Sequence, residues 1–314
     1  MKNCFVGIDT SNYTTSVAIA DEAGEILANI KRPLPVKAGE CGLRQSDAVF
    51  AHVKNLPDAM REAGTLLSDC CIRAIGVSSS PRDAENSYMP CFLAGVSAAE
   101  SMAAGLGVPV LRFSHQNGHI MAAAYSSGEM EKLLQAPVAA FHVSGGTTEM
   151  LYVTPSEDGF SVELVGETLD LNAGQAIDRV GVMMGLSFPC GKELEALAAK
   201  NEKKLPRPRV SVKGGGCHLS GLQNLAEKLW QESKDPAYVS AFVLAFIGET
   251  LKRMTAYLDE IHSGVPVVYA GGVMSNRYLQ KVLGERENTY FAEPQFSADN
   301  AAGTALLCRR SFLN

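Results

Sequence analysis

One short pattern that occurs twice constrains the fold of this chain most strongly: an apolar run, a turn of small hydroxylated residues and a second apolar run. The first copy, residues 5–20, lies within CFVGI, DTSNYTT and SVAIA; the second, residues 139–153, lies within PVAAFHV, SGGTT and EMLYV. Each copy is typical of a β-hairpin whose turn presents backbone amides and hydroxyls. The repetition predicts a duplicated domain. Helix and strand patterns alternate around the copies, which is typical of α/β layers.

Length and composition predict where the chain divides and where it resides. A chain of 314 residues exceeds what one hydrophobic core usually supports, so we expect two domains, at 1–135 and 136–314, with a helical insertion near 172–232. No apolar run approaches the roughly 20 residues that cross a bilayer, and the N-terminus has no signal-peptide pattern. We therefore expect a cytoplasmic protein without membrane contact, whose scattered cysteines stay reduced.

The charge of the chain limits how it could contact nucleic acid. A net charge of −6 excludes a protein that binds phosphates over its whole surface. One segment, KKLPRPRVSVKGGG, is basic, and its prolines and glycines predict an exposed loop. Its cationic residues are Lys203, Lys204, Arg207, Arg209 and Lys213. Any RNA contact is therefore local or shared with a partner, and a merely solvated loop is the alternative.

A pair of histidines in FSHQNGH suggests a metal site. His115 and His119 are four residues apart, so on a helix both imidazoles stand on one face and can reach one ion. Two histidines still leave a metal short of ligands. Asp299, at the expected N-cap of a closing helix, is a candidate third ligand, and this donor set suits iron, zinc or manganese. Hydrogen-bonded structural histidines are the alternative interpretation.

Seven motifs, in order along residues 5 to 310, resemble those of the TsaD family of tRNA N6-threonylcarbamoyladenosine transferases, formerly described as a glycoprotease or sialoglycoprotein endopeptidase family. They are GIDTSNYTTSVAI, SHQNGH, VSGGTTEML, GETLDLNAGQAIDRVGVMMGLSFPCGKELE, HLSGLQN, YAGGVMSN and SADNAAGTA. The resemblance implies a duplicated α/β fold of the actin, sugar-kinase and Hsp70 type, with two domains around a nucleotide cleft. It also implies transfer of a threonylcarbamoyl group from an adenylate to the adenosine beside the anticodon of tRNA.

The resemblance also implies roles for particular residues. His115, His119 and Asp299 would bind one divalent transition metal, iron or zinc, with Mg²⁺ as a further candidate cofactor. Asp9 and Ser11 would be the catalytic residues. An adenine nucleotide or acyl-adenylate would contact Ser144, Gly145, Gly146, Thr147, Asp178, Gly191 and Asn276. For Asp178 the alternative is a surface carboxylate paired with Arg179 or Lys192.

Three departures from the family pattern leave the acceptor open. Asn12–Thr15 replace a Cys-Asp-Glu-Thr turn, Thr147 replaces a histidine, and SSPRDAENSYMPCFLAG replaces a glycine-rich loop. Because such positions shape the acyl pocket, a divergent paralogue is a second possibility: a related carbamoyl or acyl transferase with another acceptor. A non-catalytic nucleotide-binding subunit is a third. Expected partners are tRNA, the other subunits of a threonylcarbamoylation complex, or a second copy in a homo- or heterodimer. A peptidase is disfavoured because no His-Glu-x-x-His occurs.

Overall fold

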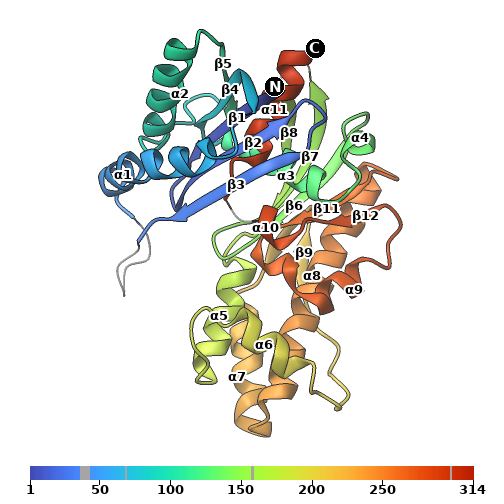
Figure 1. Ribbon diagram of the computed structural model, residues 1–314. Helices are drawn as coiled ribbons and strands as arrows, with labels where there is room; N and C mark the ends of the chain where they lie inside the picture. Colours follow the sequence, from blue (N-terminus) through green and yellow to red (C-terminus); the bar gives the residue numbers. More distant parts are fainter. Residues whose placement is uncertain (36–42, 68, 157–158, 298) are drawn as a thin grey trace. The chain divides into compact units, whose positions relative to one another are not determined.

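The computed structural model describes residues 1–314 except 36–42, 68, 157–158 and 298. The chain forms two compact units (Figure 1). Unit 1 comprises Met1–Leu134, Pro155–Ser161 and Gln295–Asn314, and unit 2 comprises Gln135–Thr154 and Val162–Pro294. The expected domains, 1–135 and 136–314, differ from these units chiefly in the C-terminal segment, which packs with unit 1.

The first unit is built on a five-stranded sheet in the order β3-β2-β1-β4-β5. Its strands are β1 (Lys2–Thr10), β2 (Thr14–Asp21), β3 (Ile26–Pro33), β4 (Cys70–Ser80) and β5 (Val110–Ser114). β2 pairs antiparallel with both β1 and β3, whereas β1, β4 and β5 run parallel. β1 and β2 are almost entirely buried, as expected for strands covered by helices on both faces.

Helices cover both faces of this sheet. The helices of unit 1 are α1 (Gln45–Gly64), α2 (Phe92–Leu106), α3 (His115–Ser126), α4 (Met130–Leu133), α10 (Pro294–Ser297) and α11 (Ala302–Leu313), of which α1, α2, α3 and α11 pack on the sheet. α1 and α2 share a core with Val6 and Ile8 of β1. Gly7, which points to the opposite face, lies under α11, and a Cβ there would be 2.5 Å from the Ala301 carbonyl oxygen. This close approach explains why the C-terminal helix belongs to unit 1 (Figure 1).

The second unit repeats the strand order of the first. Its strands are β6 (Val138–Val143), β7 (Thr148–Ser156), β8 (Gly159–Glu167), β11 (Val267–Ala270) and β12 (Thr289–Phe291), although the end of β7 and the start of β8 fall in the Pro155–Ser161 segment of unit 1. They are ordered β12-β11-β6-β7-β8, so β6 takes the place of β1. β6 pairs antiparallel with β7 and parallel with β11, just as β1 pairs with β2 and β4. The duplicated hairpin expected from the sequence is therefore confirmed.

The remaining elements of unit 2 are mostly helical. They are α5 (Ala173–Met183), α6 (Gly191–Ala198), β9 (Ser211–Lys213), β10 (Gly216–His218), α7 (Gly221–Ser233), α8 (Pro236–Ile261), the 3-10 helix η1 (Gly272–Ser275) and α9 (Arg277–Leu283). α8 begins at Pro236, and the Asp235 side chain caps it by accepting from the amides of Ala237 and Tyr238. The apolar face of α8 forms much of the unit's core. Within the described residues, no helix is long and apolar enough to span a membrane.

Candidate metal centre and nucleotide-binding turns

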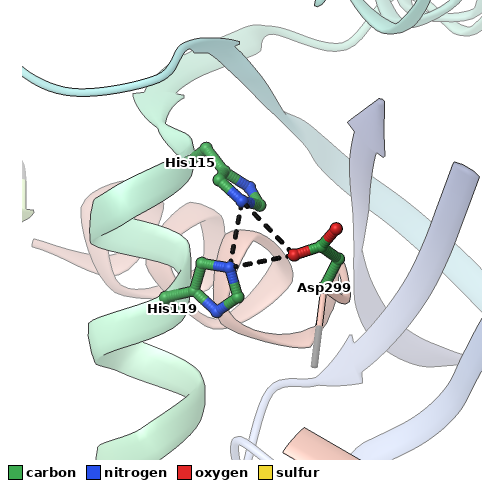
Figure 2. A group of neighbouring side chains, drawn as sticks. All are labelled: His115, His119 and Asp299. Atoms are coloured by element: carbon green, nitrogen blue, oxygen red, sulfur yellow. Dashed lines mark hydrogen bonds and ion pairs between the residues drawn. The ribbon is translucent and has the colours of Figure 1, made fainter. Parts of the chain in front are cut away.

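The two histidines of the His-x-x-x-His pattern occupy the first turns of α3. Ser114 ends β5 and caps α3, because its hydroxyl accepts from the amide of Asn117. The helix therefore begins at His115, and His119 stands over it one turn later. Their Nε2 atoms lie 3.0 Å apart and face the same point (Figure 2).

Asp299 completes the group from the far end of the chain. Its Oδ1 lies 3.3 Å from His119 Nε2 and 3.7 Å from His115 Nε2 (Figure 2). The expectation that Asp299 caps the closing helix is wrong: Ala301 is the N-cap of α11, and the Asn300 side chain accepts from the amide of Ala302. Asp299 lies in the bend before the helix, where its carboxylate points to the histidines instead of to backbone amides.

A glycine contact between α3 and α11 brings these donors together. A Cβ on Gly303 would collide with the backbone carbonyl oxygen of Gly118, and a Cβ on Gly118 would lie 3.0 Å from the Thr304 hydroxyl. Neither glycine has a positive φ, so the close approach of the two helices, and not a special backbone conformation, requires them. The contact sets the distance between the histidines of α3 and the segment just before α11.

The donor atoms fit a single metal ion. Ligand atoms about 2.1 Å from an ion and separated by about 90–110° lie about 3.0–3.4 Å apart. Two of the observed separations, 3.0 and 3.3 Å, fall in this range, and the third, 3.7 Å between His115 Nε2 and Asp299 Oδ1, is slightly longer. Within the described part of the chain, His115, His119 and Asp299 are the one group of such side chains whose donor atoms converge in this way. Two histidines and one carboxylate leave coordination positions for a substrate or water.

Asp9 orients the first of these ligands. It is 1% exposed at the end of β1, and its Oδ2 lies 2.7 Å from His115 Nδ1. Its Oδ1 accepts from the amide of Ser11 at 3.0 Å. A carboxylate behind a histidine keeps the proton on Nδ1 and leaves the Nε2 lone pair for a metal. The sequence suggested Asp9 as a catalytic residue, but nothing in the sequence indicated this contact with His115.

The charges around His115 favour a cation. Burial alone would lower the pKa of His115, but the carboxylates of Asp9 and Asp299 outweigh burial and raise it to about 10. Burial would raise the pKa values of both carboxyls, but the histidines reverse this, lowering the pKa of Asp9 and holding that of Asp299 well below its usual range. The two carboxylates thus stabilise positive charge at His115, as a site for a metal cation requires.

The turn between β6 and β7 is closed by its own serine. The Ser144 hydroxyl accepts from the amides of Gly146 and Thr147 at 3.2 and 3.1 Å. The Ser144 carbonyl accepts from the amide of Gly174 at 3.0 Å, which places the start of α5 against the turn. Gly145 and Gly146 are exposed. The structure therefore joins the predicted turn to the N-terminus of a helix, a common site for anions.

The other predicted nucleotide contacts each have a local structural role. Asp178 Oδ1 accepts from the amide of Cys190 at 2.8 Å, just before α6, and no cation pairs with Asp178 among the described residues. Gly191 is the first residue of α6. Asn276 is 7% exposed and caps α9, since its Oδ1 accepts from the amide of Leu279 at 3.1 Å. Asp178 and Asn276 thus each retain one polar side-chain atom without a hydrogen-bond partner in the described structure, Oδ2 of Asp178 and Nδ2 of Asn276.

These segments gather at one end of the second sheet. The turn at Ser144 follows β6, and the turn at Gly271 follows β11, which pairs parallel with β6. Gly271 has a φ of +101° and packs against the Val143 carbonyl. In open α/β sheets, ligands bind at the carboxyl ends of parallel strands.

At Gly145, Gly146, Gly191 and Gly272, neither a positive φ nor a neighbouring atom requires glycine. Absence of a side chain there permits close approach of a ligand.

Two segments that depart from the family pattern are tied to neighbouring elements in ways the sequence did not indicate. In the altered turn, Asn12 accepts from Gln45 Nε2 at 2.7 Å, and the Thr15 hydroxyl lies 2.8 Å from Nδ1 of the buried His52. In the altered loop, Asp83 accepts from Ser114 and Asn117 at 2.9 and 2.7 Å. Both partners of Asp83 lie at the start of α3. The loop therefore holds the helix that carries the histidines.

Comparison with known proteins gives a consistent match. The family described as TsaD, tRNA N6-adenosine threonylcarbamoyltransferase, matches residues 46–306. A protein of that name from Bacillus licheniformis is 31% identical over 305 residues, which cover 92% of this chain and 84% of the relative. One from Thermosipho africanus is 29% identical over 316 residues, covering 96% and 92% of the two chains.

Solved structures show the fold. Full-length HypF in its phosphate- and nucleotide-bound form has a TM-score of 0.60 at 13% identity, covering 98% of this chain and 46% of that one. A ROK family glucokinase from Streptomyces griseus, in complex with glucose and AMPPNP, has a TM-score of 0.52 at 15% identity and covers 98% and 99% of the two chains. The expected duplicated α/β fold of the actin and sugar-kinase type is confirmed.

Proposed function

The chain belongs to the TsaD family of tRNA N6-adenosine threonylcarbamoyltransferases, and on this premise we propose that it transfers a threonylcarbamoyl group from an adenylate to N6 of an adenosine in tRNA. The observation that carries the proposal is the convergence of His115, His119 and Asp299 in a chain that matches the family over most of its length. Retention of all three donors argues against a silent binding subunit.

The residues of unit 1 would hold the metal and the reacting group. His115, His119 and Asp299 would bind one divalent transition metal, iron or zinc, which when bound supplies a Lewis acid that polarises the acyl oxygen. Asp9 positions His115 and keeps its Nε2 aimed at the ion. The Ser11 hydroxyl is buried and has no hydrogen-bond partner within the described structure, so it is the group we assign to contact the transferred carbamoyl.

The residues of unit 2 would hold the nucleotide. Gly145 and Gly146 permit phosphate oxygens to approach the backbone at the start of α5. Asp178 would accept from a ribose hydroxyl through Oδ2, because Oδ1 is occupied by the Cys190 amide. Asn276 would donate to the base through Nδ2, because its Oδ1 caps α9. Gly191 leaves room beside the ribose.

The transfer itself exchanges one bond for another. The adenosine amine forms a C–N bond to the carbamoyl carbon, and the bond from that carbon to the phosphate oxygen of the adenylate breaks. AMP leaves with the electron pair, and the amine loses one proton. The chain's contribution is to align the amine with the carbamoyl carbon and to exclude water, which would otherwise hydrolyse the same bond.

Reconstitution tests this proposal. Purified chain is incubated with tRNA, threonine, bicarbonate, ATP and the other pathway components, and the tRNA is digested to nucleosides for mass spectrometry. Threonylcarbamoyl-modified adenosine should appear only when the chain is present. If the tRNA stays unmodified while metal and nucleotide still bind, the chain has another acceptor, and the altered turn at Asn12–Thr15 is the first place to look for the cause.

A further inference from the structure

We propose that a groove in unit 2, lined by three arginines, binds the sugar–phosphate backbone of the tRNA; this rests on the proposed function. The groove has a volume of about 660 Å³ and is lined by Pro206, Arg207, Pro208, Arg209, Val210 and Arg253. None of these residues belongs to the turns assigned to the nucleotide. The loop was expected from the sequence to be exposed and basic, whereas the contribution of Arg253 from α8 was not foreseen.

The backbone of the loop places two of the arginines side by side. Pro206 and Pro208 fix their own φ angles and keep the preceding residues out of the helical region, so the segment is extended. In an extended segment, residues two apart point to the same side. Arg207 and Arg209 accordingly both line the groove.

The loop is also anchored at both ends. Leu205 and Val210 pack against the core of unit 2. Arg253 Nη1 donates to the Val210 carbonyl at 3.5 Å, which joins the loop to α8. A ligand that binds here does not have to order the backbone, so less conformational entropy is lost on binding.

The charges of the groove are available to an anion. In the described part of the chain, no carboxylate lies within ion-pair distance of Arg207 or Arg209. Lys203, by contrast, is paired with Asp235 at 2.7 Å, and Arg253 is paired with Glu249 at 3.0 Å. Guanidinium groups match phosphate oxygens in geometry and donate two parallel hydrogen bonds.

An RNA backbone is the occupant that the charges favour. A chain with a net charge of −6 repels RNA unless cations are concentrated locally. Arg207, Arg209 and Arg253 are all exposed, so the groove is accessible to a polymer as well as to a small ion. Successive phosphates on one strand could each meet one of these side chains.

Salt dependence of tRNA binding tests the groove. Fluorescence anisotropy with labelled tRNA and the full chain is measured over a KCl series for the parent and for Arg207→Gln/Arg209→Gln. Each phosphate contact adds about 0.7–0.9 to the log–log slope, so the double variant should lower the slope by about 1.4–1.8. Lys203→Gln is the control, since Asp235 already neutralises it, and it should lower the slope by less than about 0.4.

Two results would overturn the groove assignment: an unchanged slope in the double variant, or an equal loss of slope in Lys203→Gln. If the double variant keeps the parent slope for tRNA but no longer binds inorganic phosphate in calorimetry, the groove is a small-anion site. Unfolding temperature and metal content check that the variants are folded.

The same preparations separate this proposal from the proposed function. If the parent modifies tRNA while the double variant keeps its slope, the groove assignment fails and the function stands. If the double variant loses slope while the parent never transfers the group, the function fails and the groove stands.

Discussion

His115 contacts a carboxylate through each of its ring nitrogens, Asp9 at Nδ1 and Asp299 at Nε2, with separations of 2.7 and 3.7 Å. The shorter contact, at Nδ1, fixes the orientation of the ring, because Asp9 is fully buried and also accepts from the amide of Ser11. The Nε2 atom, on the other side of the ring, faces His119 and Asp299. Asp9 therefore holds the ring at Nδ1, and Nε2 is directed at the candidate metal position.

Replacing Asp9 by Asn tests this arrangement. The amide would present an N–H to His115 Nδ1, which moves the ring proton to Nε2 and blocks the lone pair that a metal needs. We expect metal affinity to fall about 10- to 100-fold while the chain stays folded. Asp170→Asn, a carboxylate in unit 2, should leave affinity unchanged. Calorimetric titration with Zn²⁺ or Fe²⁺ measures the metal affinity of both variants. Equal affinity of Asp9→Asn and the parent would show that Asp9 does not position His115 for metal binding.

At the residue scale, residue spacing and family resemblance predicted the three metal donors but not the contacts that support them. Four-residue spacing indicated that His115 and His119 share a helix face, and resemblance added Asp299. The contact between Asp9 and His115 joins residues 106 positions apart, and no local pattern encodes such a pairing. The same is true of Asp83, whose role depends on where an irregular loop lies in space.

The packing of α3 against α11 is the decisive contact at the scale of elements. Gly118 and Gly303 let the two backbones approach, and this fixes the histidines relative to Asp299. A glycine inside a helix costs about 0.5–1 kcal/mol relative to alanine, so its presence at both positions reflects a packing requirement.

Two matched glycine substitutions test this packing. In Gly303→Ala the new methyl meets the Gly118 carbonyl, which cannot rotate away, so we expect a loss of about 1–3 kcal/mol in the free energy of unfolding and weaker metal binding. In Gly105→Ala, in α2, the methyl meets nothing within 4 Å and should stabilise the chain by about 0.5–1 kcal/mol. Urea unfolding reads out both variants. Equal stability of the two would show that the α3–α11 contact is not tight.

Asp170 holds the segment just before α7 and gives a pH-dependent prediction. Its carboxylate accepts from the amides of Leu219 and Ser220 and from the Ser220 hydroxyl. Burial alone would raise the pKa of Asp170, but these hydrogen bonds lower it to about 2. A pKa lower in the folded than in the unfolded chain stabilises the fold above the unfolded value, and this stability is lost as pH falls toward 2.

Asp170→Ala should therefore lower the free energy of unfolding by about 1 kcal/mol near neutral pH. The difference from the parent should shrink as pH falls below about 4. Asp58→Ala removes an exposed pair with Arg61 and should cost about 0.5 kcal/mol or less. Urea unfolding at several pH values measures both; a gap that does not shrink between about pH 5 and pH 2 would contradict the assigned pKa.

At the scale of elements, the sequence predicted the two hairpins better than it predicted which unit each segment belongs to. Hydrophobic alternation and turn composition indicated both hairpins, and each sheet repeats the same strand order. The position of α11 could not be predicted, because its partner, Gly7 of β1, lies at the other end of the chain. The sequence predicted the N-cap of that helix at Asp299, two residues before the actual N-cap, Ala301. Asp299 and Asn300 are both residue types that often cap helices, and in the structure it is Asn300 that accepts from the Ala302 amide.

At the scale of the whole molecule, the candidate functional groups of this acidic chain are divided between its two units. Unit 1 holds the candidate metal donors, and unit 2 holds the candidate nucleotide turns and the basic groove. The family resemblance implies the first two, whereas the groove is inferred from the charges and proline pattern of this chain. The proposed transfer to tRNA would use all three, with the metal centre serving chemistry on a tRNA acceptor.

A single-turnover transfer assay tests whether the metal centre serves transfer to tRNA. Anaerobically prepared, metal-loaded chain is mixed with threonylcarbamoyl adenylate and tRNA, and modified adenosine is quantified by mass spectrometry. His119→Ala removes one metal donor, and His218→Ala, an exposed histidine of unit 2, is the control. We predict that the parent and His218→Ala form modified adenosine and that His119→Ala forms none above background. A parent that binds metal but leaves tRNA unmodified, or a His119→Ala variant that transfers at the parent rate, would show that the metal centre does not serve this transfer.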